Sequence, residues 1–242
     1  MTSQYKHIIE FSKRSRSYKK SNIIQKEVAK YLVSRIDSNP KHILDLGAGS
    51  GAVYKQIDWN IDQFVAVDLS TELLKLHPKS NLITTIIGDF DDKNLYQDLK
   101  GYDLCIASSS LQWSRDLRNT LYMISNSSKE IAFAIFCDKT FKTIREIAGI
   151  DTFLKPSSKV LKEIENFYDI DSKVLEYHLE FQDKRSIFRY IKDSGVSGGK
   201  RILDFKSAKN LIKNYPLNYL EFEVLFVWGK SKFFSERLLS EN

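Results

Sequence analysis

Asp45-Leu46-Gly47-Ala48-Gly49-Ser50-Gly51 directly follows the apolar run His42-Ile43-Leu44, and this stretch decides the fold. The apolar run predicts a buried strand that ends in an acid. Three glycines at alternate positions then allow the main chain to approach a ligand closely, because no side chains intervene. We expect a helix to follow, with the positive end of its dipole towards the ligand. The stretch therefore predicts a strand–turn–helix that binds a ligand.

The spacing of the glycines distinguishes between two kinds of nucleotide-binding turn. Dinucleotide-binding domains favour Gly-x-Gly-x-x-Gly, whereas this chain has Gly-x-Gly-x-Gly, with Asp45 two residues before Gly47. Glycine-rich turns also occur as plain connectors. The variant resembles motif I of class I S-adenosylmethionine-dependent methyltransferases. That resemblance implies that Asp45, Gly47, Ala48, Gly49 and Gly51 bind S-adenosylmethionine, with S-adenosylhomocysteine as the product.

Two further acids follow predicted strands. Val65-Ala66-Val67 ends at Asp68-Leu69, and residues 82–87 end at Gly88-Asp89-Phe90. An acid about twenty residues past the glycine turn can accept both ribose hydroxyls. In the methyltransferase family the acid at the Asp89 position takes the adenine amino group, and the next side chain lies against the ring. Each acid could instead cap a helix or form an Asx turn, but all three lie at the carboxyl ends of strands, where open α/β sheets bind ligands.

The fourth predicted strand, residues 102–107, leads into Ser108-Ser109-Ser110-Leu111-Gln112-Trp113. The family places its acceptor-side loop here, and Ser108 is our last candidate cofactor residue. Many nitrogen methyltransferases carry Asn-Pro-Pro-Tyr at this point. Its absence disfavours methylation of DNA or of a glutamine amide.

Length and composition fit one α/β domain of 242 residues. The longest apolar run, residues 131–137, is a predicted strand, and no signal-peptide pattern is present, so we expect a cytoplasmic protein. Cys105 and Cys137 fall inside predicted strands as core thiols. The four histidines form no cluster, and we expect no metal site.

Positive charge is concentrated in two segments. Residues 1–40 hold nine basic against three acidic residues, and residues 184–215 hold nine against two. The rest of the chain is therefore acidic. Basic segments are either solvated helix faces or a docking surface for an anionic partner.

The hydrophobic pattern predicts one methyltransferase domain over residues 1–242: a helical arm over residues 1–40, a core over residues 41–183 and 216–242, and a basic helical lid over residues 184–215. Residues 41–137 alternate strand and helix, which favours a Rossmann-like, mostly parallel sheet with helices on both faces. Helices near residues 140–150 and 157–168 and strands near residues 174–181 and 220–228 follow, making seven strands. The lid is expected to form two short helices separated by residues 194–199.

The whole chain resembles the malonyl-acyl-carrier-protein O-methyltransferases of biotin synthesis. The segments that carry the resemblance are Phe11 through Tyr18 to Gln25, Ser110-Leu111-Gln112-Trp113, Thr140-Phe141 with Ile144-Arg145-Glu146, Tyr190-Ile191-Lys192-Asp193-Ser194-Gly195-Val196, and Tyr215-Pro216-Leu217-Asn218-Tyr219. Ser108-Ser109 departs from the more usual Ser-Asn.

This resemblance implies methyl transfer to the free carboxylate of malonyl-acyl-carrier protein. It suggests that Tyr18 closes over the cofactor, that Gln112 and Trp113 shape the acceptor pocket, and that Arg145 or Arg201 pairs with the acceptor carboxylate. An acidic carrier protein would dock on the basic residues of the lid, which are Lys184, Arg185, Arg189, Lys192, Lys200 and Arg201.

Two alternatives stay open. The Leu-Gln-Trp loop also occurs in trans-aconitate methyltransferases, so the acceptor could be a free small acid, and malonyl-CoA is a related possibility. A catalytically idle domain that binds RNA through its basic segments is the other alternative. The lysines lack the interleaved aromatics of a stacking platform, so we expect no nucleic acid, no membrane and a monomer.

Overall fold

The computed structural model describes residues 6–9, 23–194 and 205–234. The chain divides into two compact units. The larger unit comprises residues 25–135, 157–173 and 225–242, and the smaller unit comprises residues 1–24, 136–156 and 174–224.

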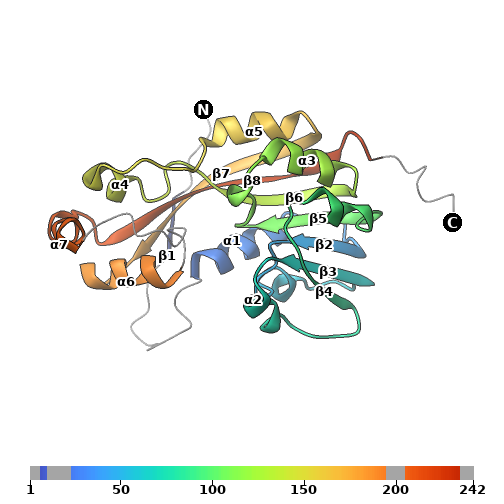
Figure 1. The fold of residues 1–242 in the computed structure, drawn as a ribbon, viewed down its shortest axis with the longest axis horizontal. Helices are drawn as coiled ribbons and strands as arrows, with labels where there is room; N and C mark the ends of the chain where they lie inside the picture. Colours follow the sequence, from blue (N-terminus) through green and yellow to red (C-terminus); the bar gives the residue numbers. More distant parts are fainter. Residues whose placement is uncertain (1–5, 10–22, 195–204, 235–242) are drawn as a thin grey trace. The chain divides into compact units, whose positions relative to one another are not determined.

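The strands of the sheet follow the order β7 (Tyr168–Glu180), β8 (Tyr219–Ser231), β6, β5, β2, β3 and β4. Its central strands lie side by side in Figure 1. They are β2 (His42–Leu46), β3 (Gln63–Asp68), β4 (Ile83–Ile87), β5 (Tyr102–Ser108) and β6 (Ser128–Phe136). Neighbouring pairs among these five strands run parallel. The predicted α/β fold with a mostly parallel sheet is confirmed.

The register of the strands gathers the predicted acids at one edge. Asp45 lies opposite Ile106 of β5, and Asp68 lies opposite Ile87, two residues before Asp89. The carboxyl ends of parallel strands meet at the same edge of a sheet, so the three acids are brought together there.

The core of the larger unit is formed by strands buried on both faces, as is typical of parallel sheets. The buried run of β3 is Phe64 to Val67, and that of β5 is Leu104 to Ala107. Cys105 and Cys137 are buried and are not joined in a disulfide, as predicted.

Helices surround this sheet, mostly where the sequence predicted them (Figure 1). They are α1 (Ile23–Val33), α2 (Thr71–Lys75), α3 (Leu117–Ser125) and α5 (Ser157–Glu165), with short 3-10 turns η1 (Tyr54–Gln56), η2 (Lys93–Gln97) and η3 (Leu111–Trp113). Ile24, Val28 and Leu32 of α1 are fully buried at helical spacing.

The prediction of a helix after the glycine turn was wrong. Only the 3-10 turn η1 lies between β2 and β3. The connection is short, and the indole N–H of Trp59 donates to the Pro40 carbonyl at 3.0 Å, which draws it back towards the start of β2. A ligand at this turn therefore does not face the end of a helix dipole.

The smaller unit contains β1 (Lys6–Ile9), α4 (Lys142–Ala148), α6 (Lys184–Ser194) and α7 (Phe205–Asn214). The long strands β7 (Tyr168–Glu180) and β8 (Tyr219–Ser231) have residues in both units. They run antiparallel, since the Phe181 N–H donates to the Asn218 carbonyl while Gly229 lies against Asp169. Helices α6 and α7 are the two helices predicted within residues 184–215, and the residues between them lie outside the described residues.

Strand β1 corrects the prediction of a wholly helical arm. Residues 6–9 pair in parallel with Glu176–Leu179 of β7 and add an eighth strand at the edge of the seven predicted ones. The local sequence carries no strong preference, so the distant pairing partner decides its conformation.

Candidate functional site

The turn after β2 packs its main chain against the loop after β5. Gly47 has a φ of 75°, and a Cβ atom there would lie 2.3 Å from the Cβ of Ser110. The Ser110 hydroxyl donates to the Leu46 carbonyl at 2.7 Å. The N–H groups of Gly47 and Ala48 both donate to the Val67 carbonyl of β3, at 2.8 and 3.0 Å. The turn is thus fixed by both neighbouring strands, and glycine is required at position 47.

Asp45 places a carboxylate without a partner below this turn. The residue is 1% exposed, and neither carboxylate oxygen has a hydrogen-bond donor among the described residues. Burial raises the pKa of this carboxyl group well above its ordinary value, and the charge of Asp68 raises it further. A buried carboxylate without a donor is costly. The site is therefore built for a cationic or hydrogen-donating ligand.

Asp68 is held rigidly at the end of β3. Its Oδ2 accepts the N–H of Gly49 at 2.8 Å, and its Oδ1 accepts the N–H of Ser70 at 2.7 Å. Each oxygen keeps a second lone pair for a ligand. The alternative of a local Asx turn is therefore correct for one oxygen, while the other oxygen ties Asp68 to the glycine turn. A carboxylate in this position suits a vicinal diol.

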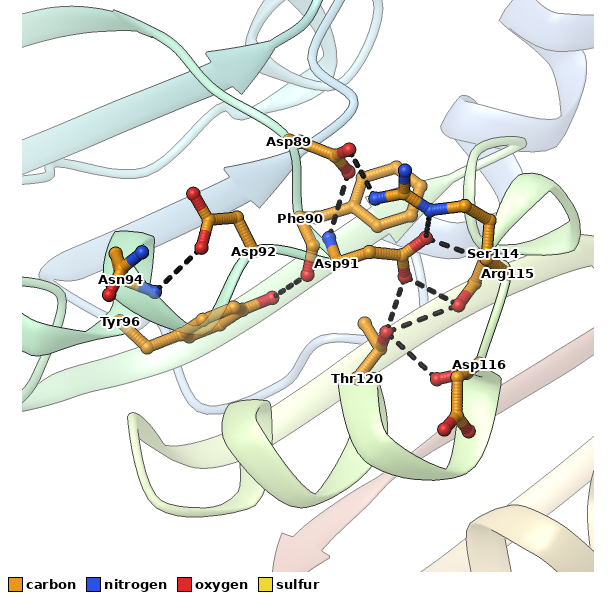
Figure 2. A network of polar contacts seen from close by, with 10 residues as sticks. All are labelled: Asp89, Phe90, Asp91, Asp92, Asn94, Tyr96, Ser114, Arg115, Asp116 and Thr120. Atoms are coloured by element: carbon orange, nitrogen blue, oxygen red, sulfur yellow. Dashed lines mark hydrogen bonds and ion pairs between the residues drawn. The ribbon is translucent and has the colours of Figure 1, made fainter.

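Asp89 belongs to a polar network that the sequence did not reveal (Figure 2). Its Oδ1 accepts the N–H of Asp91 at 2.9 Å, and its Oδ2 accepts from the Arg115 guanidinium at 2.5 Å. Asp91 in turn accepts the N–H and the Nε–H of Arg115 on Oδ2, at 2.9 and 3.2 Å. An Asp-x-Asp pair after a strand was the available signal, but nothing in the sequence connects it to Arg115.

The Asp91 carboxylate is also fixed from its other side. Its Oδ1 accepts from the hydroxyls of Ser114 and Thr120 at 2.7 and 2.6 Å (Figure 2). Burial alone would raise the pKa of Asp91, but the hydrogen bonds from Arg115, Ser114 and Thr120 together lower it below its ordinary value. Asp91 is therefore the charged anchor of the network.

The loop after β5 presents three further buried polar atoms. The hydroxyls of Ser108 and Ser109 and the Oε1 of Gln112 have no hydrogen-bond partner among the described residues. Gln112 is oriented by its Nε2, which donates to the Ser109 carbonyl at 2.8 Å. Ser109 has a φ of 62°, a conformation that non-glycine residues rarely adopt. Together with Asp45, these atoms indicate that a polar ligand completes the site.

Apolar side chains stand beside the acids. Leu69 follows Asp68 in the chain, and Ile87 lies opposite Asp68 on β4. Each of the two side chains is 63% exposed. Phe90 is half-buried next to Asp89 (Figure 2). Trp113, from the acceptor-side loop, is 43% exposed. Leu69, Ile87 and Phe90 provide apolar surface for a flat ring close to the carboxylates.

The predicted acceptor residues are only partly described. Tyr18 and Arg201 lie outside the described residues. The guanidinium of Arg145 donates through Nε to the Thr140 carbonyl at 3.3 Å and through Nη2 to the Asp138 carbonyl. These bonds close the turn between β6 and α4. Two nitrogens of the Arg145 guanidinium, which was predicted to pair with the acceptor carboxylate, therefore already donate to main-chain carbonyls.

The chain is similar to known methyltransferases in sequence and in fold. Residues 44–136 match a family model described as a methyltransferase domain. A malonyl-[acyl-carrier protein] O-methyltransferase from Anoxybacillus flavithermus is 29% identical over 54% of this chain and 52% of that protein. Another, from Neorickettsia risticii, is 22% identical over 89% of this chain and 92% of that protein. The chain spans only 52, 60 and 58% of three such relatives.

Solved structures share the fold. The YcgJ protein of Bacillus subtilis has a TM-score of 0.62 at 10% identity, over 84% of this chain and 97% of that one. Phosphoethanolamine N-methyltransferase 2 of Haemonchus contortus, solved with phosphomonomethylethanolamine and S-adenosylhomocysteine, has a TM-score of 0.54 at 14% identity, over 84% of this chain and 52% of that one.

The fold is that of class I methyltransferases, and the match of residues 44–136 to a methyltransferase domain supports S-adenosylmethionine-dependent methyl transfer. Within this class, the relatives named above confirm the resemblance to malonyl-[acyl-carrier protein] O-methyltransferases. The residues present fit the cofactor. The unpartnered Asp45 carboxylate suits its ammonium group, the remaining lone pairs of Asp68 suit its ribose diol, and the apolar surface beside Asp89 suits its adenine.

Proposed function

We propose that the protein transfers the methyl group of S-adenosylmethionine to the free carboxylate of a malonyl thioester on an acyl-carrier protein, as the names of its relatives suggest. The product would be the methyl ester that begins pimelate assembly for biotin. The observation that carries cofactor binding is the buried carboxylate of Asp45, which has no partner among the described residues.

In this proposal the cofactor supplies an activated methyl group on a sulfonium, and the residues of this chain bind and orient. Asp45 accepts the ammonium group below the glycine turn. Asp68, fixed by two main-chain N–H groups, accepts the ribose hydroxyls. Gln112 is oriented by Ser109 and turns its Oε1 to a polar ligand group.

A carboxylate acceptor explains how the reaction proceeds without a general base. A malonyl carboxyl group has a pKa of about 4, so it is already a nucleophile at neutral pH. Catalysis then rests on alignment and on the exclusion of water. Positioning alone can supply about 7–11 kcal/mol in favourable cases.

Helix α6 supports the proposed docking of a carrier protein. Asp183 begins this helix by accepting the N–H and the hydroxyl of Ser186, both at 2.8 Å. Ile187 and Tyr190 are buried, while Lys184, Arg185 and Arg189 are exposed. Tyr190 packs within the smaller unit against Phe181, with ring centroids 5.5 Å apart. The helix thus presents a basic face, which suits an acidic carrier protein.

Parallel turnover assays with labelled S-adenosylmethionine test this proposal. We expect labelled methyl ester from malonyl-acyl-carrier protein, and slower transfer to malonyl-CoA. Transfer to trans-aconitate alone would favour the free-acid alternative, whose support is the Leu-Gln-Trp loop at residues 111–113. Label found only on RNA, or on none of these acceptors, would contradict the proposal.

Several sequence-based expectations stay predictions. These are the closing role of Tyr18, the pairing of Arg145 or Arg201 with the acceptor carboxylate, the pocket-shaping role of Trp113, the monomeric state and the cytoplasmic location. Within the described residues, no group of acidic, histidine or cysteine side chains is arranged to hold a metal ion, and no helix is long and apolar enough to cross a membrane.

A further inference from the structure

Arg115 joins two carboxylates that follow β4. Its guanidinium donates to Asp89 through Nη2 and to Asp91 through Nε, while its own main-chain N–H also donates to Asp91 (Figure 2). The side chain is 72% exposed. An exposed ion pair alone has little effect on stability, but a planar guanidinium held at two points, beside a main-chain N–H bound to the same Asp91 carboxylate, fixes the geometry of what it binds.

The carboxylate of Asp91 is held in place by its hydrogen bonds. The side chain is 9% exposed, and its two oxygens together accept four hydrogen bonds, from Ser114, Thr120 and Arg115. Thr120 belongs to α3, so the network ties the loop after β4 to a helix. Arg115 is therefore held in one orientation before any ligand arrives.

This orientation restricts Asp89. The Asp91 N–H occupies one lone pair of Oδ1, and Arg115 occupies one lone pair of Oδ2. Rotation of the Asp89 carboxylate would break both bonds. Both oxygens already accept from N–H donors, and each keeps a second lone pair that can accept another hydrogen bond.

We propose that Arg115, anchored by Asp91, is a positioning residue that holds Asp89 so that the site selects a 6-amino purine over a 6-oxo purine. The inference rests on the proposed binding of S-adenosylmethionine and adds the residues that set base selectivity. A 6-amino group donates to the fixed carboxylate. A 6-oxo group instead places its carbonyl oxygen, a hydrogen-bond acceptor, against the carboxylate oxygen of Asp89, which also accepts. The Asp89 carboxylate is not free to rotate away from this contact.

Calorimetry on the full chain tests this without any turnover. The probes are S-adenosylhomocysteine and S-inosylhomocysteine, which differ at position 6 of the purine. We expect the parent protein to prefer the adenine compound by about tenfold or more. Arg115→Ala should lower this preference to about threefold or less, because Asp89 becomes free to rotate. Its melting temperature should fall only slightly, because the main-chain N–H of residue 115 and the hydroxyls of Ser114 and Thr120 still hold Asp91.

A second variant tests the anchor, and a third serves as the control. Asp91→Asn should lower the preference in the same way while also lowering the melting temperature, since the anchor is buried. Arg118→Ala is the matched control, because the Arg118 guanidinium lies 5.9 Å from the Phe167 ring instead and should leave the preference intact.

The outcomes separate the inference from the proposed function. An unchanged preference in a folded Arg115→Ala protein would overturn the positioning role, even if both ligands bind. A parent protein that binds both compounds equally would overturn the selectivity assigned to Asp89. A parent protein that binds neither compound would overturn the proposed cofactor and, with it, this inference.

Discussion

Replacing Gly47 with alanine tests the close packing of the glycine turn. Two costs add at this position. An alanine at a φ of 75° loses about 1–2 kcal/mol to backbone strain. Its Cβ would also lie 2.3 Å from the Ser110 Cβ, and relief of such overpacking costs about 1–3 kcal/mol. The sum is about 2–5 kcal/mol of unfolding free energy, which lowers Tm by about 4–20 °C in a protein of this size.

Gly149→Ala is the matched control. Gly149 has a similar φ of 63°, but a Cβ there meets no atom within 4 Å. It should therefore show the strain cost alone, about 1–2 kcal/mol. The assay is denaturant unfolding of the ligand-free protein, followed by fluorescence.

A double-mutant cycle isolates the packing cost. In a Ser110→Gly background the overlapping Cβ is gone, so Gly47→Ala should cost no more than Gly149→Ala does. Equal losses for the two alanine variants in the parent chain would refute the reasoning. So would a cost of Gly47→Ala that is unchanged by Ser110→Gly.

Three further predictions concern Asp45, the network and the lid. Because burial raises the pKa of Asp45 in the folded state, the contribution of this residue to stability is greatest below the unfolded pKa of about 4 and is lost as pH rises through the folded pKa. In melting curves, Asp45→Asn should therefore unfold at a higher temperature than the parent at pH 7 and at nearly the same temperature towards pH 4. In calorimetry, it should bind S-adenosylhomocysteine poorly. Thr120→Val removes a 2.6 Å hydrogen bond to a charged carboxylate and should cost about 1.5–3 kcal/mol in denaturant unfolding, whereas no loss would show that Asp91 is held without it. Reversing charge at Arg185 and Arg189 should raise KM for the carrier-linked malonyl group about tenfold while leaving KM for malonyl-CoA unchanged, and equal effects on both would rule out docking on α6.

Local sequence patterns predicted the elements whose conformation is set locally or by burial. The apolar runs before Asp45 and Asp68 became strands buried on both faces, and parallel pairing then brought their acids to one edge. Glycine spacing likewise predicted the turn, because positive φ at alternate positions is a local requirement.

The parts that the sequence did not predict depend on contacts between distant residues. Strand β1 exists because Lys6–Ile9 pairs with a strand about 170 residues further on. Arg115 finds Asp89 only after β4 and the loop after β5 are in place, since 26 residues separate them. The prediction of a helix after the glycine turn was wrong because the connection from β2 to β3 is short and is closed by the hydrogen bond from Trp59 to Pro40.

The central claim is that the carboxyl edge of the sheet binds an adenosyl cofactor through the carboxylates of Asp45, Asp68 and Asp89, beside the glycine turn. Calorimetry of purified protein with S-adenosylhomocysteine measures this directly, in the parent and in Asp68→Ala. We expect binding in the parent and a loss of about 10–100-fold in Asp68→Ala, since a charged acceptor for the ribose is removed. Asp92→Ala, which removes a carboxylate that accepts the Asn94 N–H at 2.9 Å, should bind like the parent. Absence of binding in the parent, or equal affinity in Asp68→Ala, would contradict the claim.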